Sequence, residues 1–122
     1  MVSTLKPIKE SFTGSWVPAS ISHHESITNI ERFAINRYGR LVIVEMTFTV
    51  GTTISEYQAE LFSGLPPSAE RNMRFRIPSV TDATKPDLVL AVTTGGKIIN
   101  QWSQGGVSAT QWAGQFCYFT TD

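Results

Sequence analysis

Two adjacent histidines followed by a glutamate, at positions 23–25, are the first residues that could bind a metal or a polar ligand. Imidazole nitrogens and carboxylate oxygens are common zinc ligands. However, neighbouring residues of an extended segment point to opposite sides, and no second group of His or Cys completes a usual ligand set. The pattern therefore favours a solvated loop and predicts no metal site and no cofactor. His24 is kept as a candidate contact for a bound ligand.

No catalytic constellation stands out in the sequence. The single cysteine, Cys117, lies between Phe116 and Tyr118 with no histidine near it in sequence, and a free cysteine usually behaves as a small buried hydrophobe. No pair among the ten carboxylates is marked as the acid and nucleophile of a glycosidase. Neither a glycine-rich phosphate loop nor a nucleophile elbow is present. We therefore expect Cys117 to be buried, and we expect the protein to have no catalytic residue and not to be an enzyme.

Tryptophans beside amide side chains are the residues best suited to hold a ligand. Trp102 lies two residues before Gln104, and Trp112 follows Gln111. The flat apolar side of a sugar ring packs on an indole while amides and hydroxyls bond to its rim. The predicted saccharide contacts are Trp102, Gln104, Trp112, Arg74, Arg76 and His24. The alternative for each tryptophan is packing in the core or between subunits, and for the two arginines it is a solvated or ion-paired face.

Strands are indicated by apolar residues that recur with a period of two. The strongest strand spans residues 40–50, and it presents Val42, Val44, Met46, Phe48 and Val50 on one face. Its other face begins apolar at Leu41 and Ile43 and then turns polar. A hairpin turn at 38–40 joins it to a strand at 31–38. Further strands are expected at 57–62, 72–77, 87–93, 97–102 and 115–121, with Arg74 and Arg76 on the open face of theirs.

These seven or eight short strands, separated by Gly and Pro, predict an all-β fold. The spacing is typical of an antiparallel β-sandwich, a jelly roll or a barrel. A length of 122 residues fits one domain, which we place at 12–122 after a polar lead-in segment or linker at 1–11. One cysteine excludes an internal disulfide.

Charge and composition exclude several classes of protein. Ten basic residues balance ten acidic ones and only 16% of residues are charged, so the chain does not bind nucleic acid through a basic face. No apolar run approaches the roughly 20 residues needed for insertion across a membrane, and no signal peptide is evident. Charged residues usually make up about 25% of a protein, and here fourteen Thr and twelve Ser supply polar side chains in their place. A net charge near zero permits self-association.

Four segments resemble a known family, the receptor-binding heads of bacteriophage tail fibres and baseplates. Residues 61–68 (LFSGLPPS) resemble the "s-G-L-P-x-P" turn of these heads, and residues 88–98 (LVLAVTTGGKI) resemble their "l-x-I-x-t-x-G-x-I" hairpin. Residues 112–121 (WAGQFCYFTT) resemble their "W-x-G-x-x-x-Y" terminal strand, and residues 38–44 match their "G-x-l-v-x-l" strand. The resemblance implies a compact β head, usually trimeric, which binds saccharides on the bacterial surface and is generally not an enzyme. The family has no fixed binding signature, so no site residue is carried over.

The resulting expectation is a homotrimeric adhesion head of a phage virion, at the tail tip or baseplate, that recognises a host-surface glycan. A three-fold axis would cover the second apolar face at 41–44 and enlarge the core of a small domain. Other phage tail or baseplate proteins are the remaining expected partners. Three alternatives stay open: a structural virion protein that contacts only other virion proteins, a small glycan depolymerase, and a cellular jelly-roll module that binds carbohydrate or acts as a trimeric signalling domain. The short lead-in, which leaves no room for a shaft, favours the first of these.

Overall fold

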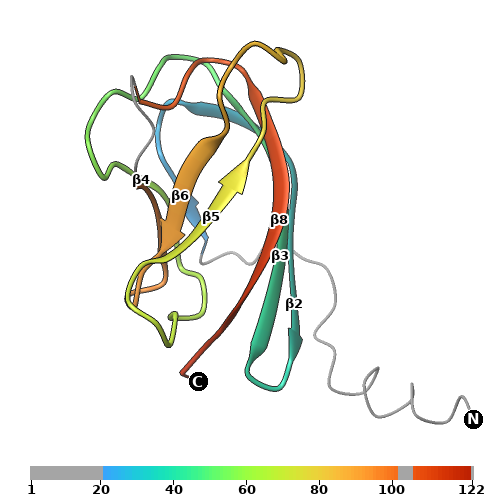
Figure 1. The fold of residues 1–122 in the computed structure, drawn as a ribbon, viewed down its shortest axis with the longest axis vertical. Helices are drawn as coiled ribbons and strands as arrows, with labels where there is room; N and C mark the ends of the chain where they lie inside the picture. The colour runs from blue at the N-terminus through green and yellow to red at the C-terminus, as the bar shows by residue number, and fades with distance from the viewer. Residues whose placement is uncertain (1–20, 102–105, 122) are drawn as a thin grey trace, which may run out of the picture.

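The computed structural model describes residues 21–101 and 106–121, and these residues form strands and loops with no helix among them. Eight strands follow one another along the chain (Figure 1). Their bounds are β1 (Ser22–His23), β2 (Ile27–Tyr38), β3 (Leu41–Val50), β4 (Glu60–Ser63), β5 (Met73–Ile77), β6 (Leu88–Val92), β7 (Lys97–Asn100) and β8 (Gln111–Phe119). Within this part of the chain, no helix is long and apolar enough to cross a membrane. The predicted lead-in at 1–11 lies outside the described residues.

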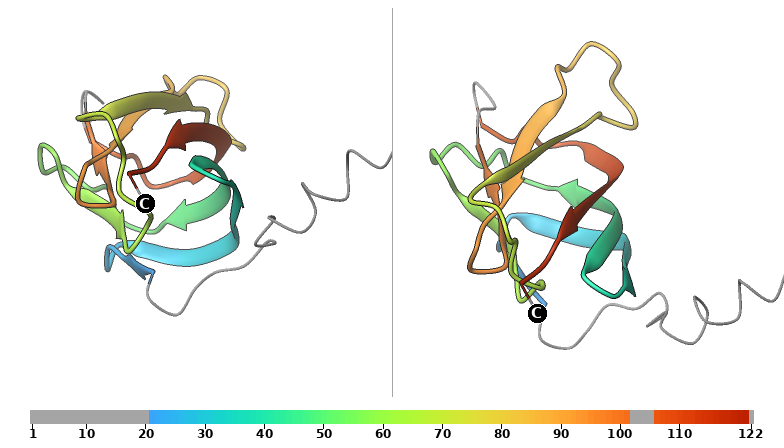
Figure 2. Two further views of the ribbon diagram at one scale, coloured as in Figure 1. Left: turned by 90° about the horizontal axis from the view of Figure 1, so that it is seen from below. Right: turned by 60° about the horizontal axis from the view of Figure 1, so that its bottom comes forward.

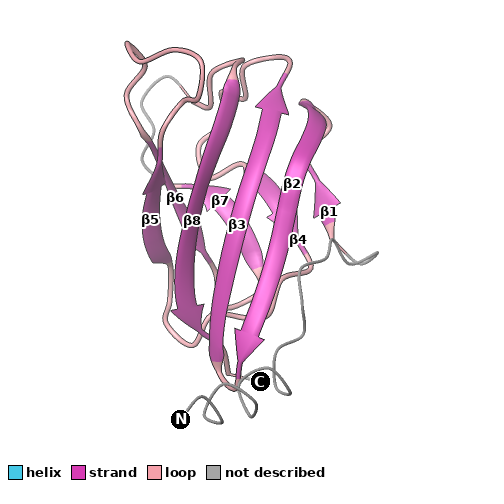
Figure 3. Ribbon diagram, turned by 90° about the vertical axis from the view of Figure 1, so that its right-hand side faces the viewer, coloured by secondary structure: helices cyan, strands magenta, loops and turns pink. Residues whose placement is uncertain are grey.

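The strands form two antiparallel sheets that face each other, which confirms the prediction of an antiparallel β-sandwich. The five-stranded sheet has the order β1-β4-β7-β6-β5, and the three-stranded sheet has the order β2-β3-β8. Figure 3 looks onto the three-stranded sheet, and Figure 2 shows the two sheets from the end of the sandwich. At one edge they are joined, because the Val80 N–H donates to the Gln111 carbonyl at 2.8 Å and Ser79 bridges to Trp112.

The central strand β3 shows why this sequence folds as a sandwich. Its five inward residues are each at most 2% exposed, whereas the residues between them are only half-buried. Tyr38 pairs with Leu41, so that Gly39 and Arg40 form a two-residue hairpin loop, and Gly39 has a φ of +63°. Positive φ is the conformation that such loops require and that glycine adopts without strain. The expected hairpin at 38–40 is therefore confirmed.

The last strand begins earlier than the sequence pattern indicates. We expected it at 115–121, but β8 starts at Gln111 and includes Gly114. A Cβ atom at Gly114 would lie 2.3 Å from Cγ2 of Ile77 on the facing sheet. Glycine is thus used here inside a strand for close packing rather than as a loop residue.

Other strand ends also differ from expectation. β2 begins at Ile27 rather than at 31, with register shifts between Ile27 and Asn29 and between Ile30 and Arg32. Bulges of this kind interrupt the alternation from which strands are predicted. β4 begins at Glu60 rather than at 57, because the chain still turns at Gln58, where φ is +58°.

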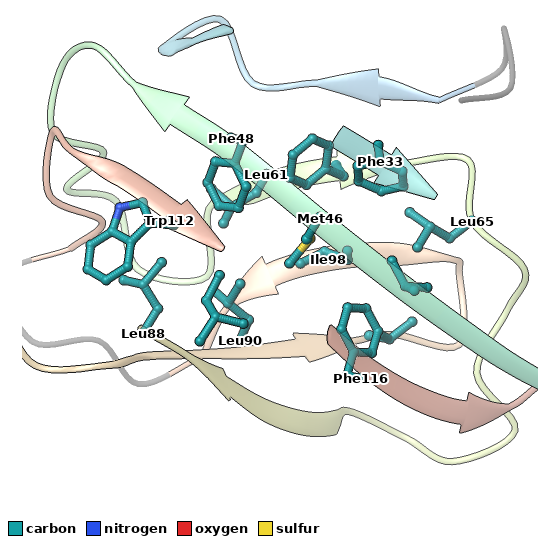
Figure 4. Close-up of a cluster of buried hydrophobic side chains, with 14 of the residues drawn as sticks. Phe33, Met46, Phe48, Leu61, Leu65, Leu88, Leu90, Ile98, Trp112 and Phe116 are labelled. Carbon is teal, nitrogen blue, oxygen red and sulfur yellow. The ribbon is translucent and has the colours of Figure 1, made fainter. Parts of the chain in front are cut away.

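The core between the sheets is rich in aromatic rings (Figure 4). Phe62 contacts both Phe33 and Phe48, with ring centroids 4.8 and 5.3 Å apart. Phe75 of β5 stacks on Phe116 of β8 at 3.7 Å. Such pairs add to the free energy gained from burial, and they connect strands from both sheets, so the sheets provide a rigid support for the side chains on their outer faces.

Candidate functional site

The structure does not assemble the six predicted saccharide contacts into one site. Trp102 and Gln104 lie outside the described residues. Trp112 is only 1% exposed, and its Nε1 donates to the Ser108 carbonyl at 3.0 Å. The prediction that Trp112 contacts a sugar is therefore wrong, because Trp112 pairs with Phe48 on the inner face of the three-stranded sheet. Its ring belongs to the core, the alternative that the sequence left open (Figure 4).

Arg74 and Arg76 are exposed on the outer face of β5, as the alternation in their strand predicts. However, β5 forms one edge of the five-stranded sheet and β1 forms the other. His24 follows β1, so three strands separate it from the two arginines.

The histidine pair lies partly in a short strand rather than wholly in a loop, because β1 pairs Ser22 and His23 with β4. The Nδ1 atom of His24 accepts a hydrogen bond from the Ser26 N–H at 3.0 Å, and its Nε2 lies 3.9 Å from a Glu56 carboxylate oxygen. Among the described residues, no group of three or more His, Cys, Asp or Glu is arranged to hold a metal ion.

Cys117 is exposed, so the expectation that it is buried is wrong. The reason is the register of β8, in which Phe116 and Tyr118 turn inward and the residue between them must turn outward. The same alternation places Phe119 outside, where its ring is 61% exposed.

A cleft at one end of the sandwich brings together two of the segments that carry the family resemblance. It lies where the end of β8 meets the segment between β4 and β5. Figure 1 shows these two segments at the lower end of the molecule. We call it the terminal cleft; its volume is about 230 Å³. Its lining residues are Leu41, Ser68, Glu70, Met73, Cys117, Tyr118 and Phe119.

The segment between β4 and β5 is fixed to β8 by hydrogen bonds. The Tyr118 hydroxyl donates to the Pro66 carbonyl at 2.8 Å, and the Ala69 N–H donates to the Phe119 carbonyl at 2.8 Å. Burial raises the pKa of the Tyr118 phenol and outweighs the opposing effect of the Arg37 charge, so the phenol remains a hydrogen-bond donor. The cleft wall is thus a loop held in place by the sheet beneath it, an arrangement common in binding sites.

The other end of this segment is held by the hairpin between β6 and β7. The Leu65 N–H donates to the Gly96 carbonyl at 3.0 Å, and a Cβ atom at Gly96 would lie 2.2 Å from the Leu65 carbonyl oxygen. Only glycine allows this approach, and its φ of +76° is also one that other residues rarely adopt. Within the segment, the Ser68 hydroxyl donates to the Glu70 carbonyl at 2.7 Å and accepts from the Glu70 N–H at 3.1 Å.

The terminal cleft combines an aromatic ring with a carboxylate. Phe119 offers an exposed ring, Leu41 and Met73 add apolar surface, and the exposed Glu70 carboxylate can accept hydrogen bonds from hydroxyl groups. The volume lies below the roughly 300–1,000 Å³ of sites for drug-sized ligands, so the cleft fits a single ring-sized group. Sequence reasoning missed Phe119 and Glu70. The alternation in the last strand, continued from Tyr118, would have indicated Phe119.

A second hollow, on the outer face of the three-stranded sheet, is less suited to a sugar. Its volume is about 290 Å³, and its floor includes Ala113 and Gly114. The charged groups beside it neutralise each other, because Arg32 Nη2 lies 3.3 Å from Glu45 Oε1. The described residues that line it include no aromatic ring, so the terminal cleft is the better candidate.

Two carboxylates elsewhere on the surface remain ionised well below neutral pH. At Glu31 burial acts to raise the pKa, but hydrogen bonds from Thr49, its own backbone, Asn29 and Gln111 outweigh it and lower the pKa. At Asp82 hydrogen bonds from the Thr84 hydroxyl and N–H lower the pKa. A glycosidase acid needs the opposite shift, so neither carboxylate is suited to donate a proton at neutral pH.

Comparison with solved structures finds the same fold in a phage protein. No protein-family model and no curated protein matches the sequence. Among solved structures, the receptor-binding protein (gp15) of Listeria phage PSA matches with a TM-score of 0.66. The chain has the fold of a phage receptor-binding protein. The match covers 99% of this chain and 73% of the phage protein at 13% sequence identity, and at that identity it establishes the fold alone.

Proposed function

We propose that this protein is an adhesion module of a phage tail that attaches to a saccharide on the host cell surface. The observation that carries the proposal is the match of almost the whole chain to a phage receptor-binding protein. Such a module would act outside the cell, at the tail tip or baseplate of the virion.

The terminal cleft is the place where we propose that the saccharide binds. The Phe119 ring would pack against the apolar face of one sugar, and Glu70 would accept hydrogen bonds from its hydroxyl groups. We expect the protein to hold the saccharide without cleaving it, since Glu70 carries the one carboxylate among the described residues that line the cleft, and glycosidases need two.

We further propose that three copies of the chain assemble around a three-fold axis. Ile43 supports this, because it lies on the outer face of β3, outside the terminal cleft, and stays only half-buried in the single chain. Three cleft sites on one particle would act together, so that weak individual contacts give firm attachment.

The test measures binding of the purified protein to a panel of bacterial cells and to arrayed cell-surface glycans. We expect Phe119→Ala and Glu70→Gln each to weaken binding by about tenfold, the loss expected for one good contact. Tyr57→Ala is the matched control, because Tyr57 is 66% exposed and lies in the segment after β3, away from the cleft. Light scattering compares the mass of each variant's assembly in solution with that of the unaltered protein. This check is needed because Phe119 pairs with Leu41 beside the proposed trimer interface, so its replacement could also change the number of assembled copies.

Three results would contradict these proposals. Failure to bind any cell or glycan would remove the adhesion function. Binding that both variants leave unchanged would exclude the terminal cleft. Release of reducing ends from a bound polysaccharide would show that the protein is a depolymerase.

A structural virion component is the second candidate function. Leu41, Ile43 and Phe119 leave an apolar strip on one end of the outer sheet face, and such a strip could instead contact another tail or baseplate protein. This alternative predicts incorporation into the virion together with an absence of binding to cells and glycans.

A further inference from the structure

Two basic residues on the outer faces of the sheets are paired with acids on neighbouring strands. Arg32 of β2 meets Glu45 of β3 at 3.3 Å, and Lys97 of β7 meets Glu60 of β4 at 2.9 Å. Such cross-strand pairs neutralise charge locally. They provide the comparison for the two arginines of β5, which differ from this pattern.

Arg74 and Arg76 have uncharged neighbours across the sheet. Arg74 pairs with Ala91 and Arg76 pairs with Val89. Neither guanidinium makes an ion pair or hydrogen bond with another described residue. Ala91 is fully buried and Val89 is half-buried, so β6 offers neither guanidinium an acidic partner.

The strand that carries the two arginines is anchored on its inner face. Phe75, which lies between them, turns inward and stacks on Phe116 at 3.7 Å with an angle of 14° between the rings. Alternation then sends Arg74 and Arg76 out on the same face, with Cα atoms about 7 Å apart. Met73 lines the terminal cleft from the opposite face of β5, so the arginine face is separate from the cleft.

Two guanidinium groups at this spacing match the chemistry of an oxyanion. Each group presents five N–H donors in a planar fork that binds oxygen pairs. One carboxylate satisfies one such fork with its two oxygens and carries one charge. A phosphate group has more oxygens and up to two charges, so two forks can bind it from adjacent positions.

We infer that Arg74 and Arg76 form a phosphate-binding site on the outer face of β5. The ligand is a phosphate group, either free or as an ester in a larger molecule. The phosphate site does not depend on saccharide binding in the terminal cleft, so an experiment can contradict either proposal and leave the other standing.

The experiment follows the side-chain Nε–Hε resonances of the arginines by NMR during titration with inorganic phosphate and then with short-chain polyphosphate. We expect the Arg74 and Arg76 signals to shift together and to saturate. The R74Q/R76Q double variant should bind polyphosphate at least about tenfold more weakly. The R71Q/K85Q double variant is the matched control, since it also removes two positive charges but from the segments before and after β5, and it should change the affinity less than twofold.

The source and the chemistry of the ligand are separated by further arms of the same titration. Saturation with inorganic phosphate alone indicates a site for free phosphate, and saturation only with polyphosphate indicates a site for a phosphorylated polymer. Oligogalacturonate, a carboxylate polymer, should bind more weakly than polyphosphate. Equal binding of oligogalacturonate, absence of shifts at Arg74 and Arg76, or an unaltered affinity in the double variant would each overturn the inference.

Discussion

Trp112 shows how one side chain can fit two predictions until its register is known. Glutamines and small residues surround it in the sequence, as they do in many sugar-binding sites. Its backbone pairing with Phe48 directs the ring inward, and the Ser108 carbonyl satisfies its only polar atom. A buried tryptophan needs such an acceptor, so the polar neighbours that indicated a ligand belong partly to the support of a core residue.

Replacement of Trp112 tests its place in the core. Trp112→Ala should lower the free energy of unfolding by about 3–5 kcal/mol, because it removes the largest side chain among the fully buried ones. Trp112→Phe keeps part of the ring but leaves the Ser108 carbonyl without its donor, so a loss of about 1–3 kcal/mol is expected. Urea unfolding followed by circular dichroism measures both.

The control is Tyr57→Ala, which truncates a ring of high exposure and should change stability by less than about 0.5 kcal/mol. A loss below about 1 kcal/mol for Trp112→Ala would show that the indole is not packed in the core.

At the scale of elements, alternation predicted the strands but not the exact ends. β3, β5 and β6 are found within a residue of their expected bounds, because each has an uninterrupted period of two. β8 was missed at its start because Gly114 serves packing against Ile77, a contact that depends on the facing sheet. The terminal cleft could not be predicted for a similar reason, since Glu70 and Phe119 meet only through pairing between segments fifty residues apart.

The segment between β4 and β5 provides the prediction at this scale. Tyr118→Phe removes the hydrogen bond from the Tyr118 hydroxyl to the Pro66 carbonyl, which should cost about 1 kcal/mol. The cleft wall would then open more often, so the Ala69 N–H, which donates to the Phe119 carbonyl, should exchange with solvent several-fold faster. Saccharide binding should weaken, because a loosened wall must be ordered again when the ligand binds.

Amide hydrogen exchange resolved by residue measures this effect. Tyr57→Phe serves as the control, since it removes the hydroxyl of an exposed tyrosine outside the cleft. Unchanged exchange at Ala69 in Tyr118→Phe would mean that this hydrogen bond does not hold the segment in place.

At the scale of the molecule, the fold is shared with a phage receptor-binding protein at only 13% identity. A sandwich needs alternation, turn residues and apolar volume, and many sequences meet these conditions. The structure can therefore match where no sequence-level model does. It also follows that residues of the phage protein cannot be transferred to the terminal cleft, whose chemistry must be argued from this chain.

Assembly is the last prediction, and it follows from the outer face of β3. Ile43 is apolar, half-buried and outside the terminal cleft, and the zero net charge of the chain opposes self-association little. If that face meets a three-fold axis, light scattering after size exclusion should give roughly three times the 13.5 kDa of one chain.

Ile43→Lys would place three charges near the axis and should give the single-chain mass. Val80→Lys makes the same change at a residue that is 52% exposed in the loop after β5, and it should leave the trimer intact. A single-chain mass for the unaltered protein that still binds its glycan would separate adhesion from assembly, because the cleft is complete within one chain and trimerisation adds only avidity.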